Sequence, residues 1–308
     1  MKLYPMKFIP IYQEKIWGGS ALRTLFGRNL SNDKIGESWE LSSLTSGASI
    51  IQNGEYAGKT LNELTALAPQ QFFGSRSLQG TTLFPLLIKI LDANDKLSVQ
   101  VHPNDAYASL LEAGQGKTEA WYVLQAQTGA EIIYGLKANT SKADFILAME
   151  HHILDVLQKI PVKTGDMVYV PAGRVHALCG GVVVYEVQQT SDITYRLYDY
   201  DRVGADGKTR QLHVDKAVQV INFNEQVDTD FAKTKLESPY FSMEKVTLDG
   251  ILELDLADRF MILCVINGNG EIASVTGSEE ICQGETILIP ACLEKISING
   301  KIEFLKIR

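Results

Sequence analysis

The sequence predicts a mainly β protein built from two barrels, and three observations lead to this prediction. Short alternating or apolar runs recur between turn residues, at the spacing of a β-barrel or sandwich. Helical periodicity is confined to a few short stretches. The pattern GDMVYVPA at 165–172 returns in shape as GETILIPA at 284–291, which indicates that one strand-and-turn unit occurs twice.

The strands are predicted from the apolar and alternating runs. Their lengths and their flanking turn residues are typical of strands in a barrel or sandwich. The predicted strands include residues 83–91, 97–101, 120–124, 167–170 and 182–188. The second barrel is expected around the repeated pattern near the end of the chain.

Three stretches have helical periodicity instead. Residues 60–68 begin with TLNE, a capping-box pattern. Residues 104–113 begin with Asn-Asp, which suits an N-cap. Residues 141–158 place apolar side chains at helical intervals and end before Pro161. Three histidines in helix-like stretches are interpreted as surface or packing residues: His151, His152 and His213.

Charge and composition exclude several classes of protein. The 308 residues carry 29 basic and 37 acidic side chains, a formal net charge of −8, and no basic cluster suits nucleic acid as a partner. No apolar run could span a bilayer and no signal-peptide pattern is present, so we expect a cytoplasmic protein without a membrane partner. Without a C-x-x-C pair, the cysteines are expected to be reduced and mostly buried: Cys179, Cys264, Cys282 and Cys292.

Two upstream segments offer polar side chains that share a strand face. In LSVQVHP at 97–103, Gln100 and His102 are two residues apart and therefore point to the same side of a strand. In GKTEAWYVL at 116–124, the same spacing puts Lys117 and Glu119 on one face together with a tryptophan. A closed barrel would bring the two faces together.

A third segment, GDMVYVPAGRVH at 165–176, ends in a turn that aims His176 inward. With it, Gln100, His102 and Glu119 form a mixed nitrogen and oxygen set that suits one divalent metal per chain, such as zinc. Gln100 is the weakest member of the set. An amide oxygen is a poor zinc ligand, and Gln100 would alternatively hydrogen-bond a metal-bound water.

These motifs resemble those of cupins, which are jelly-roll barrels (double-stranded β-helices) that hold a metal in the lumen. The glycine, proline and histidine spacing of 165–176 resembles the second cupin motif, and the Gln100 and His102 pair resembles the first with one histidine replaced. The chain departs from a generic cupin because residues 103–117 are inserted before Glu119.

One cupin family has this arrangement. The chain resembles a short bacterial type I mannose-6-phosphate isomerase from about Pro10 to about Asn222, with six motifs in the family's order: IWGG at 16–19, GESWELS at 36–42, LSVQVHPND at 97–105, GKTEAWYVL at 116–124, PAGRVHAL at 171–178 and TYRLYDYDR at 194–202. The resemblance implies two barrels with a small helical insertion. Residues 1–230 would form the metal-binding domain and residues 231–308 a cupin-like domain without metal ligands, because CLEKISI after the second turn contains no histidine.

The resemblance also implies an activity, the interconversion of mannose 6-phosphate and fructose 6-phosphate through an enediol or enediolate. The partner would therefore be a small sugar phosphate. Lys117 and Glu186 match the family's proton-transfer positions, and either could be the base. Arg196 matches an active-site arginine that would stabilise an oxyanion or help to open the sugar ring. Three further residues are expected to contact the substrate: Ser98, Lys89 and Arg202.

Two other functions stay open at this stage. A cupin oxygenase would bind iron through two histidines and a carboxylate, a count that His102, Glu119 and His176 satisfy. A non-catalytic sugar-binding cupin would keep the barrel but would have no need of the lysine, glutamate and arginine in the family's register. The sequence does not distinguish zinc from manganese, cobalt or iron, and it leaves the oligomeric state, monomer or dimer, undetermined.

Overall fold

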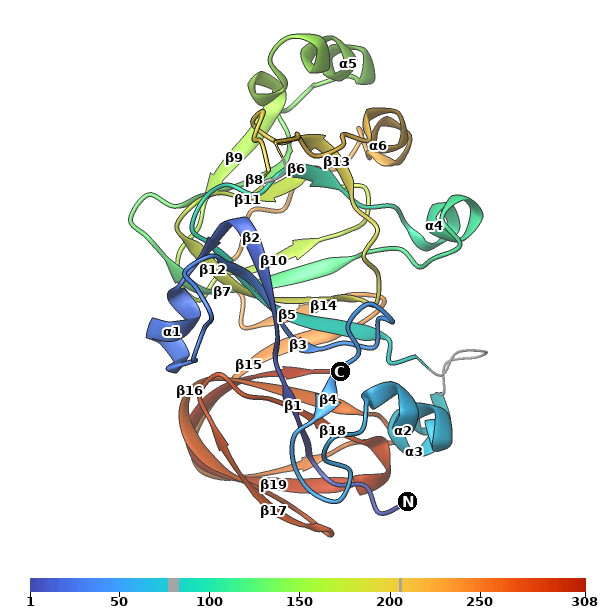
Figure 1. The fold of residues 1–308 in the computed structure, drawn as a ribbon, viewed down its shortest axis with the longest axis vertical. Helices are drawn as coiled ribbons and strands as arrows, with labels where there is room; N and C mark the ends of the chain where they lie inside the picture. The colour runs from blue at the N-terminus through green and yellow to red at the C-terminus, as the bar shows by residue number, and fades with distance from the viewer. Residues whose placement is uncertain (77–82, 205–206) are drawn as a thin grey trace.

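Two stacked β-structures make up the molecule (Figure 1). The computed structural model describes residues 1–76, 83–204 and 207–308. The larger structure consists of two antiparallel sheets that face each other. The six-stranded sheet runs in the order β10 (Met167–Val170), β7 (Glu119–Ala126), β12 (Val182–Gln189), β5 (Leu86–Ala93), β3 (Ile35–Leu41) and β2 (Ile11–Gly19).

The five-stranded sheet closes the other side of this barrel. Its order is β13 (Tyr195–Tyr198), β6 (Val99–Val101), β11 (His176–Leu178), β8 (Glu131–Leu136) and β9 (Leu157–Pro161). A shared apolar core joins the two sheets, with Val123 and Val184 from one sheet packed among Ile132 and Leu178 from the other. Beside this apolar core, a cavity between the two sheets is lined by polar and charged side chains.

The third sheet forms the second barrel, drawn in orange and red in Figure 1. Its order is β14 (Lys235–Glu237), β15 (Ser242–Asp255), β19 (Lys295–Ile307), β16 (Met261–Ser274), β18 (Thr286–Ile289), β1 (Met6–Ile9) and β4 (Ile50–Ile51), and β17 (Gly277–Cys282) pairs with β16. The N-terminal strands β1 and β4 therefore extend the C-terminal sheet. We propose a division of the chain into residues 1–230 and 231–308. β1 and β4 belong to the first part of the sequence but pair within the sheet of the second part.

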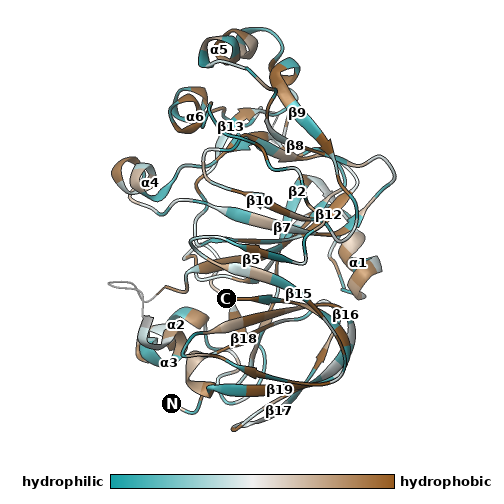
Figure 2. Ribbon diagram, turned by 180° about the vertical axis from the view of Figure 1, so that it is seen from behind, coloured by the Kyte–Doolittle hydropathy of each residue, from teal (hydrophilic) through white to brown (hydrophobic). Residues whose placement is uncertain are grey.

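Strand alternation explains how the six-stranded sheet is covered on both faces. On β5, Ile88 and Ile90 pack toward the second barrel, where Ile262 and Leu288 belong to the same core. The residue between them, Lys89, points the opposite way into the first barrel, where it lines a cavity. Apolar segments, brown in Figure 2, lie mostly on the strands of both barrels.

The helices are short and lie outside the sheets. They are α1 (Ala21–Phe26), α2 (Leu61–Leu67), α3 (Pro69–Phe73), α4 (Asp105–Leu111), α5 (Lys142–Glu150) and α6 (Val214–Val220), with 3₁₀ turns η1 (Gly74–Arg76), η2 (Ile153–Val156) and η3 (Ala291–Leu293). The predicted capping box is present, since the Thr60 hydroxyl accepts a hydrogen bond from the Glu63 amide. Asn104 caps α4 as predicted.

The predicted helix over 141–158 is wrong in its second half. The helix α5 ends at Glu150, and Leu157 and Ile160 belong to β9 at the edge of the five-stranded sheet. They pair with Leu136 and Ile132 of β8, so the hydrogen bonds of the sheet override the helical periodicity here.

The expectation of mostly buried thiols is also wrong. All four cysteines are free, but Cys282 and Cys292 are exposed.

The repeated pattern is the same turn in both barrels. The Gly165 amide donates to the Val123 carbonyl at 2.8 Å, and the Gly284 amide donates to the Val265 carbonyl at 2.9 Å. Both glycines have positive φ, 93° and 85°, a conformation that favours glycine over other residues. After the turn, β10 leads to the five-stranded sheet whereas β18 leads to η3 and a core of apolar side chains.

Arg28 ties the two barrels together. Its guanidinium donates two hydrogen bonds to the Glu40 carboxylate, at 2.6 and 2.9 Å, and a third to the Gly284 carbonyl at 2.6 Å. The side chains of Arg28 and Glu40 are only 9% and 2% exposed. The pair is therefore a buried ion pair at the junction between the barrels.

Replacing Arg28 by Met is expected to lower the free energy of unfolding by ~3–5 kcal/mol, because it leaves the Glu40 charge buried without a partner. The double variant R28M/E40M should be less destabilised than the single variant. Urea unfolding of both variants measures this difference, and an R28M protein as stable as the wild type would contradict the account.

Candidate metal centre and cavity

A cavity of about 330 Å³ opens between the two sheets of the first barrel. Strands of both sheets contribute to its walls, β3, β5 and β12 from one side and β6 and β13 from the other. Its lining is rich in charge, with these titratable side chains: Lys15, Glu37, Lys89, Lys117, Glu186, Asp192, Arg196 and Arg210. A cavity with so many ionic groups is suited to a polar, charged ligand.

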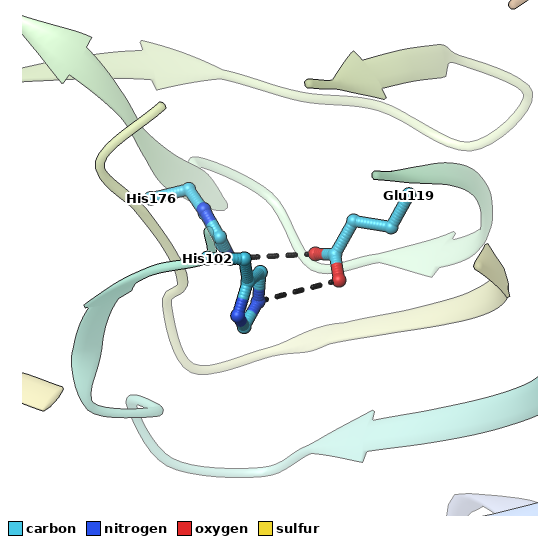
Figure 3. A group of neighbouring side chains, drawn as sticks. All are labelled: His102, Glu119 and His176. Atoms are coloured by element: carbon cyan, nitrogen blue, oxygen red, sulfur yellow. Dashed lines mark ion pairs between the residues drawn. The ribbon is translucent and has the colours of Figure 1, made fainter. Parts of the chain in front are cut away.

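Three predicted ligands, His102, Glu119 and His176, meet inside the first barrel (Figure 3). His102 follows β6, Glu119 begins β7 and His176 begins β11, and one ligand atom of each lies within 4.8 Å of the other two. The Glu119 carboxylate points at both rings, with Oε2 3.5 Å from His102 Nε2 and Oε1 3.3 Å from His176 Nε2. All three side chains are buried.

The insertion before Glu119 does not separate it from the histidines. Residues 103–117 form α4 and its flanking loops, and the chain closes on itself because the Lys117 amide donates to the Pro103 carbonyl at 3.1 Å. The Gly116 amide also donates to the Asp105 carboxylate at 2.8 Å. Glu119 is thereby returned to a position beside His102.

Backbone carbonyls orient both imidazole rings. His102 Nδ1 lies 2.9 Å from the Ile193 carbonyl oxygen, and His176 Nδ1 lies 2.9 Å from the Arg174 carbonyl oxygen. A carbonyl can only accept, so each Nδ1 carries the proton and each neutral ring presents the Nε2 lone pair to the cluster. Metal-binding histidines are held by this kind of outer contact.

Two buried atoms in the cluster have no hydrogen-bond partner, His176 Nε2 and Glu119 Oε1. Buried polar atoms are rarely left without a partner. Both atoms are electron-pair donors that face each other, so neither can satisfy the other, whereas a divalent cation would satisfy both. Two imidazole nitrogens and a carboxylate are also a donor set that divalent metals accept. The residues present therefore fit a metal ion.

Electrostatics keep these donors in the forms that a metal requires. Burial, together with the nearby Lys117 ammonium, lowers the pKa of His102 to about 3. Burial also lowers the pKa of His176. Burial alone would raise the pKa of Glu119, but the Lys117 ammonium holds it well below its usual value. Neutral imidazoles and an ionised carboxylate are the ligating forms.

Lys117 lies between the cluster and the cavity. Its Nζ is 3.0 Å from His102 Nε2 and also contacts Glu119 Oε2.

The predicted fourth ligand, Gln100, also lines the cavity. It is paired with His176 of β11 on one side and with Arg196 of β13 on the other, so the three residues form a row across the five-stranded sheet.

Lys89 and Glu186 occupy the opposite wall. They are direct cross-strand partners on β5 and β12, with Lys89 Nζ 3.4 Å from Glu186 Oε1. The Trp121 indole donates to Glu186 Oε2 at 3.0 Å. Burial and the negative charge of Glu119 raise the pKa of Glu186. This carboxyl group is therefore easier to protonate than an exposed glutamate.

Of the residues predicted to contact the substrate, some line the cavity and one does not. Ser98 and Lys89 line the cavity, as does Arg196. Arg202 does not line it, because its guanidinium donates to the Asp199 carboxylate at 2.6 Å and contacts the Lys96 carbonyl oxygen. Arg210 was not predicted from the sequence, yet it lines the cavity. No motif marks it, because its position depends on how the loop after β13 folds back.

The fold and this donor set define a cupin with a candidate metal centre in its first barrel. Two family models match the chain, one described as phosphomannose isomerase type I, catalytic domain, over residues 6–129, and one as mannose-6-phosphate isomerase, cupin domain, over residues 232–308. Mannose-6-phosphate isomerase ManA of Bacillus subtilis is 41% identical, with 98% of both chains covered.

A mannose-6-phosphate isomerase of Streptococcus mutans is 37% identical over 95% of this chain and 94% of its own. The crystal structure of the mannose 6-phosphate isomerase from Bacillus subtilis superimposes with a TM-score of 0.90 at 37% identity, covering 99% of this chain and 100% of that one. The chain therefore belongs to the type I mannose-6-phosphate isomerase family. Within the described residues, the structure contains no helix long and apolar enough to cross a bilayer.

The pH dependence of stability tests whether Lys89 and Lys15 stabilise the ionised Glu37 carboxylate in the cavity wall. Burial would raise the pKa of Glu37, but Lys89 and Lys15 lower it from 4.5 to about 2. A lowered folded-state pKa adds stability above the unfolded-state value, and this stability is lost as the pH falls from about 4.5 toward 2. By that linkage, ionised Glu37 contributes roughly 3 kcal/mol at neutral pH.

The stability gap between wild type and Glu37→Gln is accordingly expected to be largest near neutrality and to shrink below pH 4.5. Urea unfolding at several pH values between 7 and 3 measures it. A gap that stays constant over this range would show that the two lysines do not stabilise the carboxylate.

Proposed function

We propose that this protein is a metal-dependent aldose–ketose isomerase that interconverts mannose 6-phosphate and fructose 6-phosphate. The observation that carries the proposal is the buried cluster of His102, Glu119 and His176, which Lys117 connects to a charged cavity. Relatives named as mannose-6-phosphate isomerases over nearly the whole chain support the choice of substrate. A cupin oxygenase could use the same three ligands, but it has no need of this basic cavity.

His102, Glu119 and His176 would hold the ion, which we propose to be one zinc per chain. Gln100 is a further proposed ligand, because it lies in the strand beside His176 and lines the cavity. Once bound, the divalent metal would polarise the carbonyl and hydroxyl oxygens of the sugar. The protein contributes a rigid, buried donor set whose two imidazoles are fixed by backbone carbonyls.

The reaction moves a proton between two neighbouring carbons of the open-chain sugar through an enediol or enediolate. Lys117 and Glu186 are the two carriers that we propose for this proton. Glu186 is buried, and its raised pKa brings it closer to the working range of a general acid and base. Lys117 lines the cavity next to the cluster and supplies a positive charge near the reacting oxygens.

Arg196 would stabilise negative charge that develops on the sugar oxygens or help to open the ring. Its Nη1 donates to the Gln211 carbonyl at 2.9 Å, which directs the guanidinium along the cavity wall. Its Nε is buried and has no hydrogen-bond partner. Donors that are held in place before the substrate arrives stabilise such charge without reorganisation.

Removing one ligand tests the metal centre. We expect His176→Ala to lose bound metal and isomerase turnover together, by more than the roughly 100-fold effect of changing an outer-shell residue. The assay follows fructose 6-phosphate formation from mannose 6-phosphate, and elemental analysis reports metal per chain. His152→Ala, an exposed histidine outside the cavity, is the matched control, and full activity of His176→Ala would exclude this centre.

Arg196→Ala separates metal binding from turnover. This variant should keep its metal content while kcat falls by roughly 10²–10³, the usual effect of removing a donor that stabilises developing charge. If this variant lost its metal, Arg196 would be needed for metal binding and not for the stabilisation of developing charge.

A further inference from the structure

The position of the Lys117 ammonium depends on the backbone that carries it, because a lysine side chain is a flexible stem that ends in a compact charge. Its Nζ reaches His102 Nε2 at 3.0 Å and contacts Glu119 Oε2, and the residue is only 5% exposed. Residues 115–118 lie between α4 and β7 and belong to no strand. Contacts outside the sheet ladders therefore decide where the ammonium lies.

Three successive amides of this segment are each bound by a different partner. The Gly116 amide donates to Asp105 Oδ1 at 2.8 Å. The Lys117 amide donates to a backbone carbonyl at 3.1 Å, and the Thr118 amide donates to Gln189 Oε1 at 2.9 Å. Buried backbone groups require such partners. Two of the three partners are side chains, and we call these two residues, Asp105 and Gln189, the clamp.

Asp105 is an ionised acceptor in the clamp. Its Oδ2 accepts from the Tyr240 hydroxyl at 2.6 Å, and its Oδ1 accepts from both Gly116 and Gln189. Burial would raise the pKa of the Asp105 carboxyl, but these hydrogen bonds lower it. An ionised carboxylate can only accept hydrogen bonds.

This carboxylate fixes the orientation of the Gln189 side chain. Gln189 Nε2 donates to Asp105 Oδ1 at 3.0 Å, so Oε1 is the atom that faces the Thr118 amide. The Gln189 backbone amide donates to the Thr118 carbonyl at 3.2 Å. Gln189 is 6% exposed. Gln189 therefore binds the peptide groups on both sides of Thr118, the residue between Lys117 and Glu119.

Gly116 allows the segment to lie against the start of α4. A Cβ on Gly116 would lie 2.6 Å from the Asp105 backbone nitrogen and 3.0 Å from Asp105 Oδ1. A residue without a Cβ is required where the backbone approaches its neighbours this closely. The glycine and the carboxylate thus serve the same contact.

Glu119 is held in a different way. It begins β7 and is paired with Gln188 of β12 and with Val170 of β10, so ladders on both sides fix its backbone. Lys117 lies two residues earlier and is outside these ladders. Loss of the clamp would therefore displace the Lys117 ammonium while the Glu119 carboxylate stays in place.

We propose that Asp105 and Gln189 are positioning residues for the isomerisation and that they act through Lys117. The residues that line the cavity include Lys117 but neither member of the clamp. The inference rests on the proposed function, in which Lys117 is a carrier of the transferred proton. Because displacement of a reacting group by about 1 Å costs on the order of 10² in rate, the clamp contributes to turnover without touching the substrate.

Kinetics of Gln189→Met with mannose 6-phosphate test the proposal. Methionine has a similar length but makes neither side-chain hydrogen bond of the clamp. We expect kcat to fall on the order of 10- to 100-fold, with KM changed by less than about threefold. Metal per chain should be unchanged, because the Glu119 backbone is held by its ladders. Gln125→Met, the same change at an exposed position of β7, is the matched control.

A double-mutant cycle tests whether the clamp acts through Lys117. In a Lys117→Met background, the added Gln189→Met change should alter kcat by less than about threefold, because the group that it positions is already absent. An equal fall in both backgrounds would overturn the proposal. So would an unchanged kcat in Gln189→Met, or a loss of metal together with kcat, which would mean that the clamp supports Glu119.

Asp105 offers a conservative rescue. Asp105→Asn keeps an Oδ1 that can accept from Gly116 and Gln189, whereas Asp105→Ala removes it. We expect Asp105→Asn to retain most of the wild-type kcat and Asp105→Ala to resemble Gln189→Met. An Asp105→Ala protein with the kcat of the wild type would exclude Asp105 from the clamp.

Chemical labelling keeps this inference distinct from the proposed function. Acetylation of individual lysines by acetic anhydride, measured by mass spectrometry, should be slow at Lys117 in the wild type and several-fold faster in Gln189→Met. Lys89, which contacts Glu186 on the opposite wall, is the internal reference and should label equally in both proteins.

The labelling result does not depend on turnover. If the wild type does not convert mannose 6-phosphate, the proposed function fails, yet faster labelling of Lys117 alone would still support the positioning role of the clamp. Equal labelling of Lys117 in wild type and Gln189→Met would exclude that role, and so would a matching rise at Lys89, which would indicate general loosening of the barrel.

Discussion

The Glu119 carboxylate is a fully buried charge between two sheets, and much of the first barrel serves to make that burial tolerable. Taking a carboxylate out of water costs several kcal/mol even after the protein relaxes around it. The Lys117 ammonium offsets part of this cost, and the close approach of His102, Glu119 and His176 requires β6, β7 and β11 to converge at one point. A cation between the three donors would complete the compensation, which is why the metal centre and the fold depend on each other.

The second barrel contributes structure, and among the described residues the group of side chains that could hold a metal lies in the first barrel. It repeats the glycine turn of the first barrel with the same backbone hydrogen bonds, and a cluster of apolar side chains forms its core. Its outer surface covers the six-stranded sheet, so that Ile88 and Ile90 are buried on the side away from the cavity. With both faces covered, that sheet is a rigid wall from which Lys89 and Glu186 project.

Strand alternation made the inner face of the barrel predictable from the sequence. A spacing of two residues was sufficient to place Lys117 beside Glu119, because the period of a strand is fixed by its backbone. The boundary at 157 could not be predicted, since Leu157 and Ile160 satisfy a helical period and only pairing with β8 decides otherwise. Arg202 and Arg210 were equally ambiguous. Which of them faces the cavity depends on their competition for Asp199, a tertiary contact that leaves no local pattern.

One metal ion held by His102, Glu119 and His176 is proposed to support the isomerisation. The most direct test is to strip the purified protein with a chelator, add zinc back in steps, and measure bound metal and mannose 6-phosphate turnover on the same samples. Activity should disappear on stripping and return in proportion to bound metal, up to one ion per chain. Full turnover by the metal-free protein, or metal restored to one per chain without turnover, would contradict the account.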